Sequence, residues 1–110
     1  MFLLILSLLS TFSFASLTVV NNLENEISVL TEGHCNPLEH LHDEKIIEAG
    51  NSATYEFSED NFPICLVIRT HNHHYISDKI EKVKACRVIV TNDEHQQPII
   101  KMGQDCYIAD

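Results

Sequence analysis

Histidine is the residue type in this 110-residue chain best placed to do chemistry, and three of the seven histidines fall within four positions. They lie in the stretch THNHHYIS at residues 70–77, and a second pair forms the stretch His-Leu-His at residues 40–42. In an extended segment, positions i and i+2 point to the same face, so each His-x-His pair can offer two imidazoles to one ion. Imidazole nitrogen suits zinc and copper. One hypothesis is therefore a transition-metal site built from His40, His42, His71, His73 and His74.

The metal hypothesis requires the segments 34–43 and 71–74 to converge, because a metal site needs three or four ligands. A second interpretation is pH sensing, since histidines gain a proton near pH 6.5 and seven of them would offset much of a net charge of −9. The simplest interpretation is a set of solvated polar side chains on loops. We take this third interpretation for THNHHYIS and keep zinc or copper binding as the alternative.

The motifs of common enzyme classes are missing from the sequence. It contains no G-x-S-x-G, no H-E-x-x-H and no glycine-rich phosphate loop. A thiolate nucleophile is also not expected, because the cysteines are predicted to be oxidised. The sequence therefore predicts a protein that is not an enzyme, with no catalytic residues and no organic cofactor.

The first sixteen residues, MFLLILSLLSTFSFAS, have the layout of a secretory signal peptide. No charged side chain occurs from Phe2 to Ala15, and Ser13 and Ala15 occupy the −3 and −1 positions of a cleavage before Ser16. The apolar run is shorter than the roughly 20 residues that a membrane-spanning helix needs. We therefore predict a signal peptide at 1–15 and a single domain at 16–110. The expected location is secreted or periplasmic, without membrane insertion after cleavage.

Four cysteines follow the predicted cleavage point, and an even number in a short exported chain indicates two disulfides. Three pairings are possible, and the sequence leaves all three open. We favour Cys35–Cys65 with Cys86–Cys106, because these pairs join neighbours in chain order. Each bridge would stabilise the fold by about 2–4 kcal/mol.

Short β-rich runs recur along the chain, separated by turn residues, as in proteins built mainly from strands. The expected strands are 17–20, 27–30, 45–49, 52–57, 63–70, 85–91, 98–102 and 105–108, and residues 32–43 are expected to form a long polar loop. Asp78 and Glu81 have capping-box spacing, which predicts one short helix near 78–84. The expected fold is all-β, a small antiparallel sandwich or barrel of seven to eight short strands.

Acidic residues outnumber basic ones by 16 to 7. Such a surface repels phosphate backbones and anionic lipid, so neither nucleic acid nor a membrane surface is an expected partner. It favours a basic protein partner. The sequence therefore predicts a small exported binding module without catalytic activity, such as a secreted factor or hydrolase inhibitor. The alternative is a secreted metal-binding protein that uses the His-x-His pairs.

Overall fold

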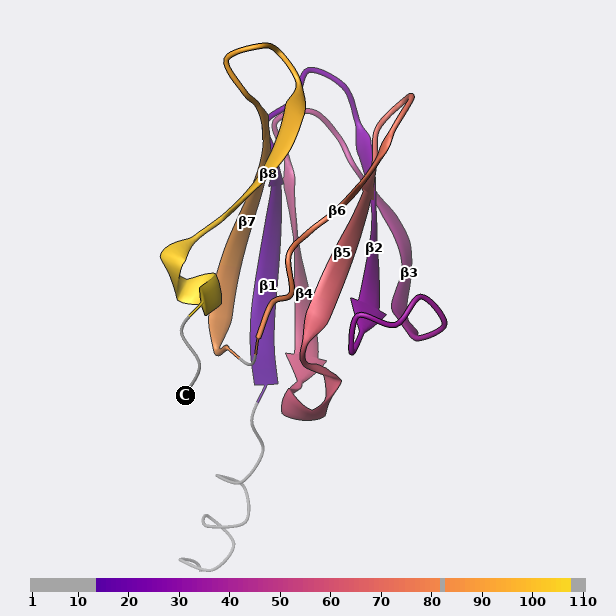
Figure 1. The fold of residues 1–110 in the computed structure, drawn as a ribbon, viewed down its shortest axis with the longest axis vertical. Helices are drawn as coiled ribbons and strands as arrows, with labels where there is room; N and C mark the ends of the chain where they lie inside the picture. The colour runs from indigo at the N-terminus through magenta and orange to yellow at the C-terminus, as the bar shows by residue number, and fades with distance from the viewer. Residues whose placement is uncertain (1–13, 82, 108–110) are drawn as a thin grey trace, which may run out of the picture.

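The computed structural model describes residues 14–81 and 83–107, which form a sandwich of two four-stranded β-sheets (Figure 1). The strands are β1 (Phe14–Asn21), β2 (Ile27–Gly33), β3 (His40–Ile47), β4 (Ser52–Ser58), β5 (Ile64–Arg69), β6 (His74–Ile76), β7 (Ala85–Asn92) and β8 (Pro98–Met102). Two short 3-10 turns accompany them, η1 (Glu59–Asn61) and η2 (Gln104–Tyr107). The predicted all-β fold is confirmed, and of the two expected architectures the chain forms the sandwich.

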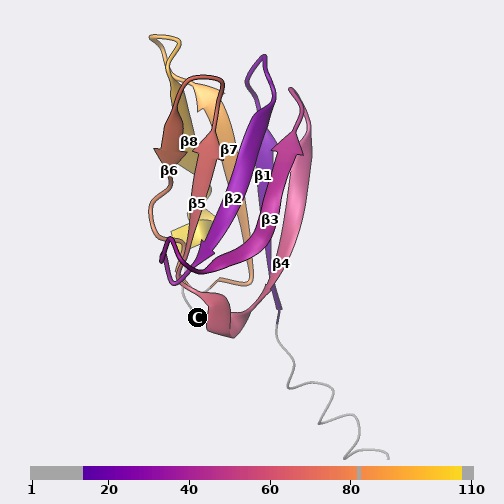
Figure 2. The same cartoon turned by 90° about the vertical axis from the view of Figure 1, so that its right-hand side faces the viewer.

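The first sheet has the strand order β4-β1-β7-β8, and the second sheet has the order β3-β2-β5-β6. All neighbouring strands are antiparallel except β1 and β7, which run parallel. The β3–β4 connection crosses from the second sheet to the first, so these two strands lie along the same side of the sandwich (Figure 2).

The core lies between the sheets and follows the alternation of side chains along each strand. In β5, for example, Ile64, Leu66 and Ile68 are fully buried between the sheets, whereas Arg69 at the end of the strand is exposed. Tyr55 of β4 also lies in this core, and burial raises its pKa to about 12. The hydroxyl of Tyr55 is therefore neutral at physiological pH.

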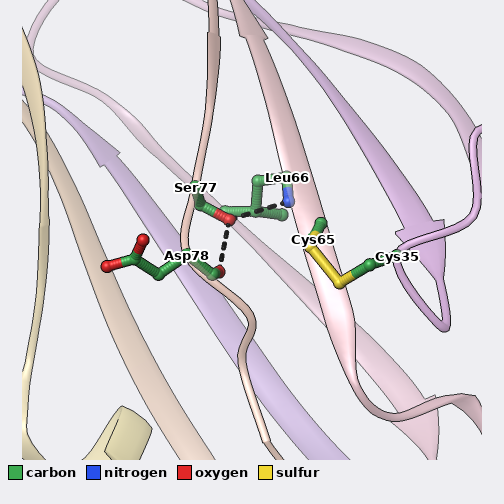
Figure 3. The surroundings of a disulfide bond; sticks show 5 residues. All are labelled: Cys35, Cys65, Leu66, Ser77 and Asp78. Carbon is green, nitrogen blue, oxygen red and sulfur yellow. Dashed lines mark hydrogen bonds between the residues drawn. A yellow bond between two sulfur atoms is a disulfide. The ribbon is translucent and has the colours of Figure 1, made fainter.

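Both disulfides form with the favoured pairing, Cys35–Cys65 and Cys86–Cys106. The first ties the β2–β3 loop to the start of β5 (Figure 3), and the second ties η2 to β7. The four sulfur atoms are therefore not available as metal ligands.

The predicted helix near 78–84 is wrong for the described residues of that segment. Instead, Ile80 forms an isolated β-bridge with Ile64, with N–H···O distances of 3.0 and 2.8 Å. The reason is that β5 extends past the end of the short β6, and its buried backbone groups need partners that a helix would not supply. Two residues further along β5, the Leu66 N–H donates a hydrogen bond of 2.9 Å to the hydroxyl of Ser77 (Figure 3).

Two other expected boundaries are corrected. The loop predicted at 32–43 spans only residues 34–39, because β2 continues to Gly33 and β3 begins at His40. A hydrogen bond of 2.8 Å from the Gly33 N–H to the Glu39 carbonyl closes this shorter loop. The strand predicted at 105–108 is replaced by η2 over its described residues.

The predicted signal peptide lies outside the described residues except for its last two. Phe14 and Ala15 are the first residues of β1, opposite Ser58 and Phe57 of β4. Cleavage before Ser16 would therefore shorten β1 by two residues. Within residues 14–81 and 83–107, no helix is long and apolar enough to cross a membrane.

Candidate functional site

Four connections between strands meet at one end of the sandwich, which we call the loop end (Figures 1 and 2). They are residues 22–26, 48–51, 70–73 and 93–97. They share this end because β1, β3, β5 and β7 run towards it, while β2, β4, β6 and β8 run away from it. The disulfide Cys35–Cys65 and both 3-10 turns lie towards the opposite end.

The predicted metal ligands are divided between two places in the second sheet. His71 and His73 lie in the turn between β5 and β6, and His74 is the first residue of β6. His40 and His42 lie on β3 rather than in a loop. Since β3 and β6 are the two outer strands of the sheet, the two groups lie at opposite edges.

The pairing register measures how far apart the two histidine groups are. On the central strand β2, Glu32 lies opposite His40, whereas Ser28 lies opposite Arg69, the partner of His74. The backbones are therefore about 13 Å apart along the strands and about 14 Å apart across the sheet. Metal–nitrogen distances are about 2 Å, so the structure does not bring the two groups to one ion.

No group of three or more histidine, cysteine, aspartate or glutamate side chains is arranged to hold a metal within the described part of the chain. Zinc or copper binding stays a prediction, although His71, His73 and His74 lie apart from His40 and His42. All three are exposed, as expected for the stretch THNHHYIS, although the stretch leads from β5 into β6 and not into a helix.

Histidines outside this turn contact nearby polar groups. The Nε2 atom of His34 lies 2.8 Å from the carbonyl oxygen of Asp60, which connects the β2–β3 loop to η1. The Nδ1 atom of His40 lies 4.0 Å from the carboxylate of Glu32, a residue that is 7% exposed. The His34 contact is a hydrogen bond at the end opposite the loop end, whereas the 4.0 Å separation of His40 and Glu32 is too long for one.

An open groove of about 930 Å³ lies at the loop end, on the side of the second sheet. Ser28, Ile46 and Arg69 line it from the strands, and the other lining residues come mainly from three of the connecting loops. The full lining is Glu24, Asn25, Glu26, Ile27, Ser28, Ile46, Glu48, Ala49, Arg69, Thr70, His71 and Asn72. A smaller groove of about 290 Å³ shares residues 24–26 and 70–72 and continues to the β7–β8 turn.

The larger groove is acidic. Glu24, Glu26 and Glu48 line it, and Arg69 is the one Lys or Arg among its lining residues. The Arg69 guanidinium donates a hydrogen bond of 2.9 Å to the carboxylate of Glu44, so much of its charge is already balanced. The groove therefore suits a cationic group.

Asn21 holds in place the loop that carries two of these carboxylates. Its side-chain amide is fully buried and donates hydrogen bonds of 2.9 Å to the carbonyl oxygens of Asn25 and Ile47. Its side-chain oxygen accepts a third bond, from the Leu23 N–H, at 2.9 Å. The predicted strands 17–20 and 27–30 leave Asn21 in the connection between them, and the preference of asparagine for Asx-turns is the one sequence signal for this role.

Comparison with known proteins identifies the fold but no family. No family model matches the chain, and no curated protein matches its sequence. The chain is similar to the NMR structure of a protein from Eubacterium rectale, with a TM-score of 0.64 and 11% identity over 84% of this chain and 90% of that one. It is also similar to a structure described as a trapped toxin, with a TM-score of 0.50 and 11% identity. That match covers 84% of this chain but 24% of the other. Because the identity is 11% in both cases, the two matches show the fold alone.

Proposed function

We propose that this protein is an exported binding module without catalytic activity, whose loop-end groove binds a basic segment of a partner protein. The observation that supports it most directly is the groove itself, in which Glu24, Glu26 and Glu48 are opposed only by Arg69 among the lining residues. A lysine or arginine entering the groove would meet three carboxylates. The neighbouring cation is already paired with Glu44.

The charge of the whole chain supports the same partner. With a net charge of −9, long-range attraction would speed the approach of a basic protein. Complementary charge contributes more to specificity and association rate than to affinity. The contacts within the groove must therefore supply most of the free energy of binding.

Export is the second part of this proposal. Two disulfides in one small domain are typical of proteins that reside in an oxidising compartment. Together with the signal-like residues 1–15, they support secretion or a periplasmic location.

A short peptide of lysine and serine tests the binding proposal. Fluorescence anisotropy with the labelled peptide should show saturable binding that weakens as salt is added, because the contact is between exposed charges. The double substitution Glu24→Gln/Glu26→Gln should reduce the affinity about tenfold, since two charge contacts are removed.

The matched control is Glu56→Gln, which removes an exposed carboxylate on β4 of the first sheet. It should leave peptide affinity unchanged. If it weakens binding as much as the groove substitutions do, the peptide senses only net charge and the groove is not the binding site.

A further inference from the structure

The outer face of the second sheet carries a row of apolar side chains. The register places Leu30 of β2 opposite Val67 of β5, and Val67 opposite Ile76 of β6. Figure 2 shows these strands side by side, with this sheet towards the viewer. Ile76 is 69% exposed, and Leu30 and Val67 are half-buried. We call these three residues the apolar row.

Ile46 of β3 adds a second exposed apolar side chain on the same face. It is 66% exposed and lies opposite Ser28, in the row of residues next to the apolar row. Of the four large exposed hydrophobic residues in the described chain, only Ile46 and Ile76 lie on this face. The other two, Phe14 and Leu38, lie at the end opposite the loop end.

The outer face of the first sheet is more polar. Thr18 and Thr54 face each other with their hydroxyl oxygens 3.1 Å apart, and Arg87 follows them on β7. Its half-buried apolar residues lie in two neighbouring rows, with Val20 and Ile89 beside Lys101 and with Ile99 opposite Thr91. The two outer faces therefore differ in their exposed apolar side chains. Ile46 and Ile76 are mostly exposed on the second sheet, whereas the mostly exposed Phe14 of the first sheet lies at the end opposite the loop end.

The apolar row and the acidic groove belong to one continuous surface. Ser28, Ile46 and Arg69 line the groove and also lie on the outer face of the second sheet. The Arg69–Glu44 ion pair joins β5 to β3 across β2, and so lies between Ile46 and the apolar row. Exposed apolar surface bordered by polar groups is typical of protein interaction sites.

We propose that the partner docks across this face, with apolar side chains on the apolar row and on Ile46 and a basic side chain in the groove. This inference rests on the proposed function and specifies the partner as a segment that is both basic and apolar. A second copy of this chain is the less suitable occupant, because it would bring two chains of net charge −9 face to face.

Three peptides of equal length separate the apolar contribution from the charge contribution. One contains leucine and lysine, the second replaces leucine with serine, and the third keeps leucine but replaces lysine with glutamate. The leucine–lysine peptide should bind about tenfold more tightly than the serine–lysine peptide, because it buries apolar surface as well. The leucine–glutamate peptide should not bind measurably, because its charge has the same sign as the groove.

The double substitution Ile46→Thr/Ile76→Thr tests whether this gain comes from the outer face. Threonine keeps the β-branched shape that strands favour, and both positions are mostly exposed, so the fold should be retained. The double variant should bind the leucine–lysine peptide about tenfold less tightly. The single variant Ile76→Thr leaves every groove-lining residue in place, so it should lose part of that affinity and bind the serine–lysine peptide as before. Ile89→Thr, on the outer face of the first sheet, is the matched control and should change neither affinity.

The outcomes distinguish this inference from the proposed function. If no lysine peptide binds the unmodified protein, both are overturned. If the serine–lysine peptide binds but leucine adds nothing, or the double substitution leaves the gain in place, only the docking surface is overturned. Sedimentation that shows a dimer dissociated by Ile46→Thr/Ile76→Thr would assign the face to a second copy and also overturn the inference.

Discussion

Ser77 completes the hydrogen bonding of β5 at the point where β6 ends. Its hydroxyl accepts the Leu66 N–H at 2.9 Å and donates to the Asp78 carbonyl at 2.9 Å, and its own N–H donates to the Leu66 carbonyl at 3.0 Å. Leu66 is fully buried, so its N–H has no access to water. The serine side chain thus replaces a backbone carbonyl in the edge of the second sheet.

The substitution Ser77→Ala should lower the free energy of unfolding by about 1–3 kcal/mol, because it leaves a buried N–H without an acceptor. Urea denaturation followed by circular dichroism measures the change. Ser52→Ala is the control, since Ser52 is exposed on β4, and it should change stability by less than about 0.5 kcal/mol. Equal effects of the two substitutions would show that the Ser77 hydroxyl does not stabilise the sheet.

At the scale of elements, the two disulfides attach peripheral segments to the sandwich far from the groove. Cys35–Cys65 holds the β2–β3 loop, in which His34 and Cys35 adopt left-handed backbone conformations with φ of 57° and 54°. Cys86–Cys106 holds η2 against β7, where a hydrogen bond from Gly103 to the Arg87 carbonyl also fixes the turn. Both bridges therefore contribute to stability rather than to the shape of the groove.

Replacing either pair by serine should lower the free energy of unfolding by about 3–4 kcal/mol, as expected for closed loops of this length. The sequence separations of the two bridges are 30 and 20 residues, so their effects should be similar. Lysine–serine peptide affinity, measured where the variants remain folded, should change less than twofold. A large loss of affinity with intact folding would mean that a bridge shapes the loop end.

At the scale of the whole molecule, the location of the protein decides whether these bridges can form. Disulfides persist in oxidising compartments and are rare in the cytosol. If cleavage occurs before Ser16, the new N-terminal nitrogen is the atom that donates a hydrogen bond of 3.0 Å to the Lys84 carbonyl. The shortened β1 would therefore keep a contact at its first residue.

Mass spectrometry of the protein recovered from a secreting host tests export directly. We expect a chain that begins at Ser16, lacks four hydrogen atoms relative to the reduced form, and reacts with thiol reagents only after reduction. Recovery of the chain from the cytosol with Met1 and four free thiols would contradict this prediction and the binding proposal that depends on it.

Local residue patterns were sufficient to predict the all-β fold, most strands and the two disulfides. In a run such as Ser52–Phe57, apolar and polar side chains alternate because one face of the strand is buried and the other faces water. This pattern can be recognised from a few neighbouring residues alone. The capping-box spacing of Asp78 and Glu81 is equally local, yet the helix predicted from it is wrong. Ile80 instead forms a β-bridge with Ile64 of β5, whose edge is not paired with β6 at that point. Long-range hydrogen bonding overrode the local preference there.

Only the tertiary structure decided which candidate residues meet. Strand order puts His40 and His74 at opposite edges of one sheet, and strand direction puts Glu24, Glu48 and His71 around one groove. Neither order nor direction is encoded in the spacing of residues along the chain, because both depend on contacts between segments far apart in the sequence. The histidines that stand out in the sequence are therefore divided in space, while glutamates that do not stand out are brought together.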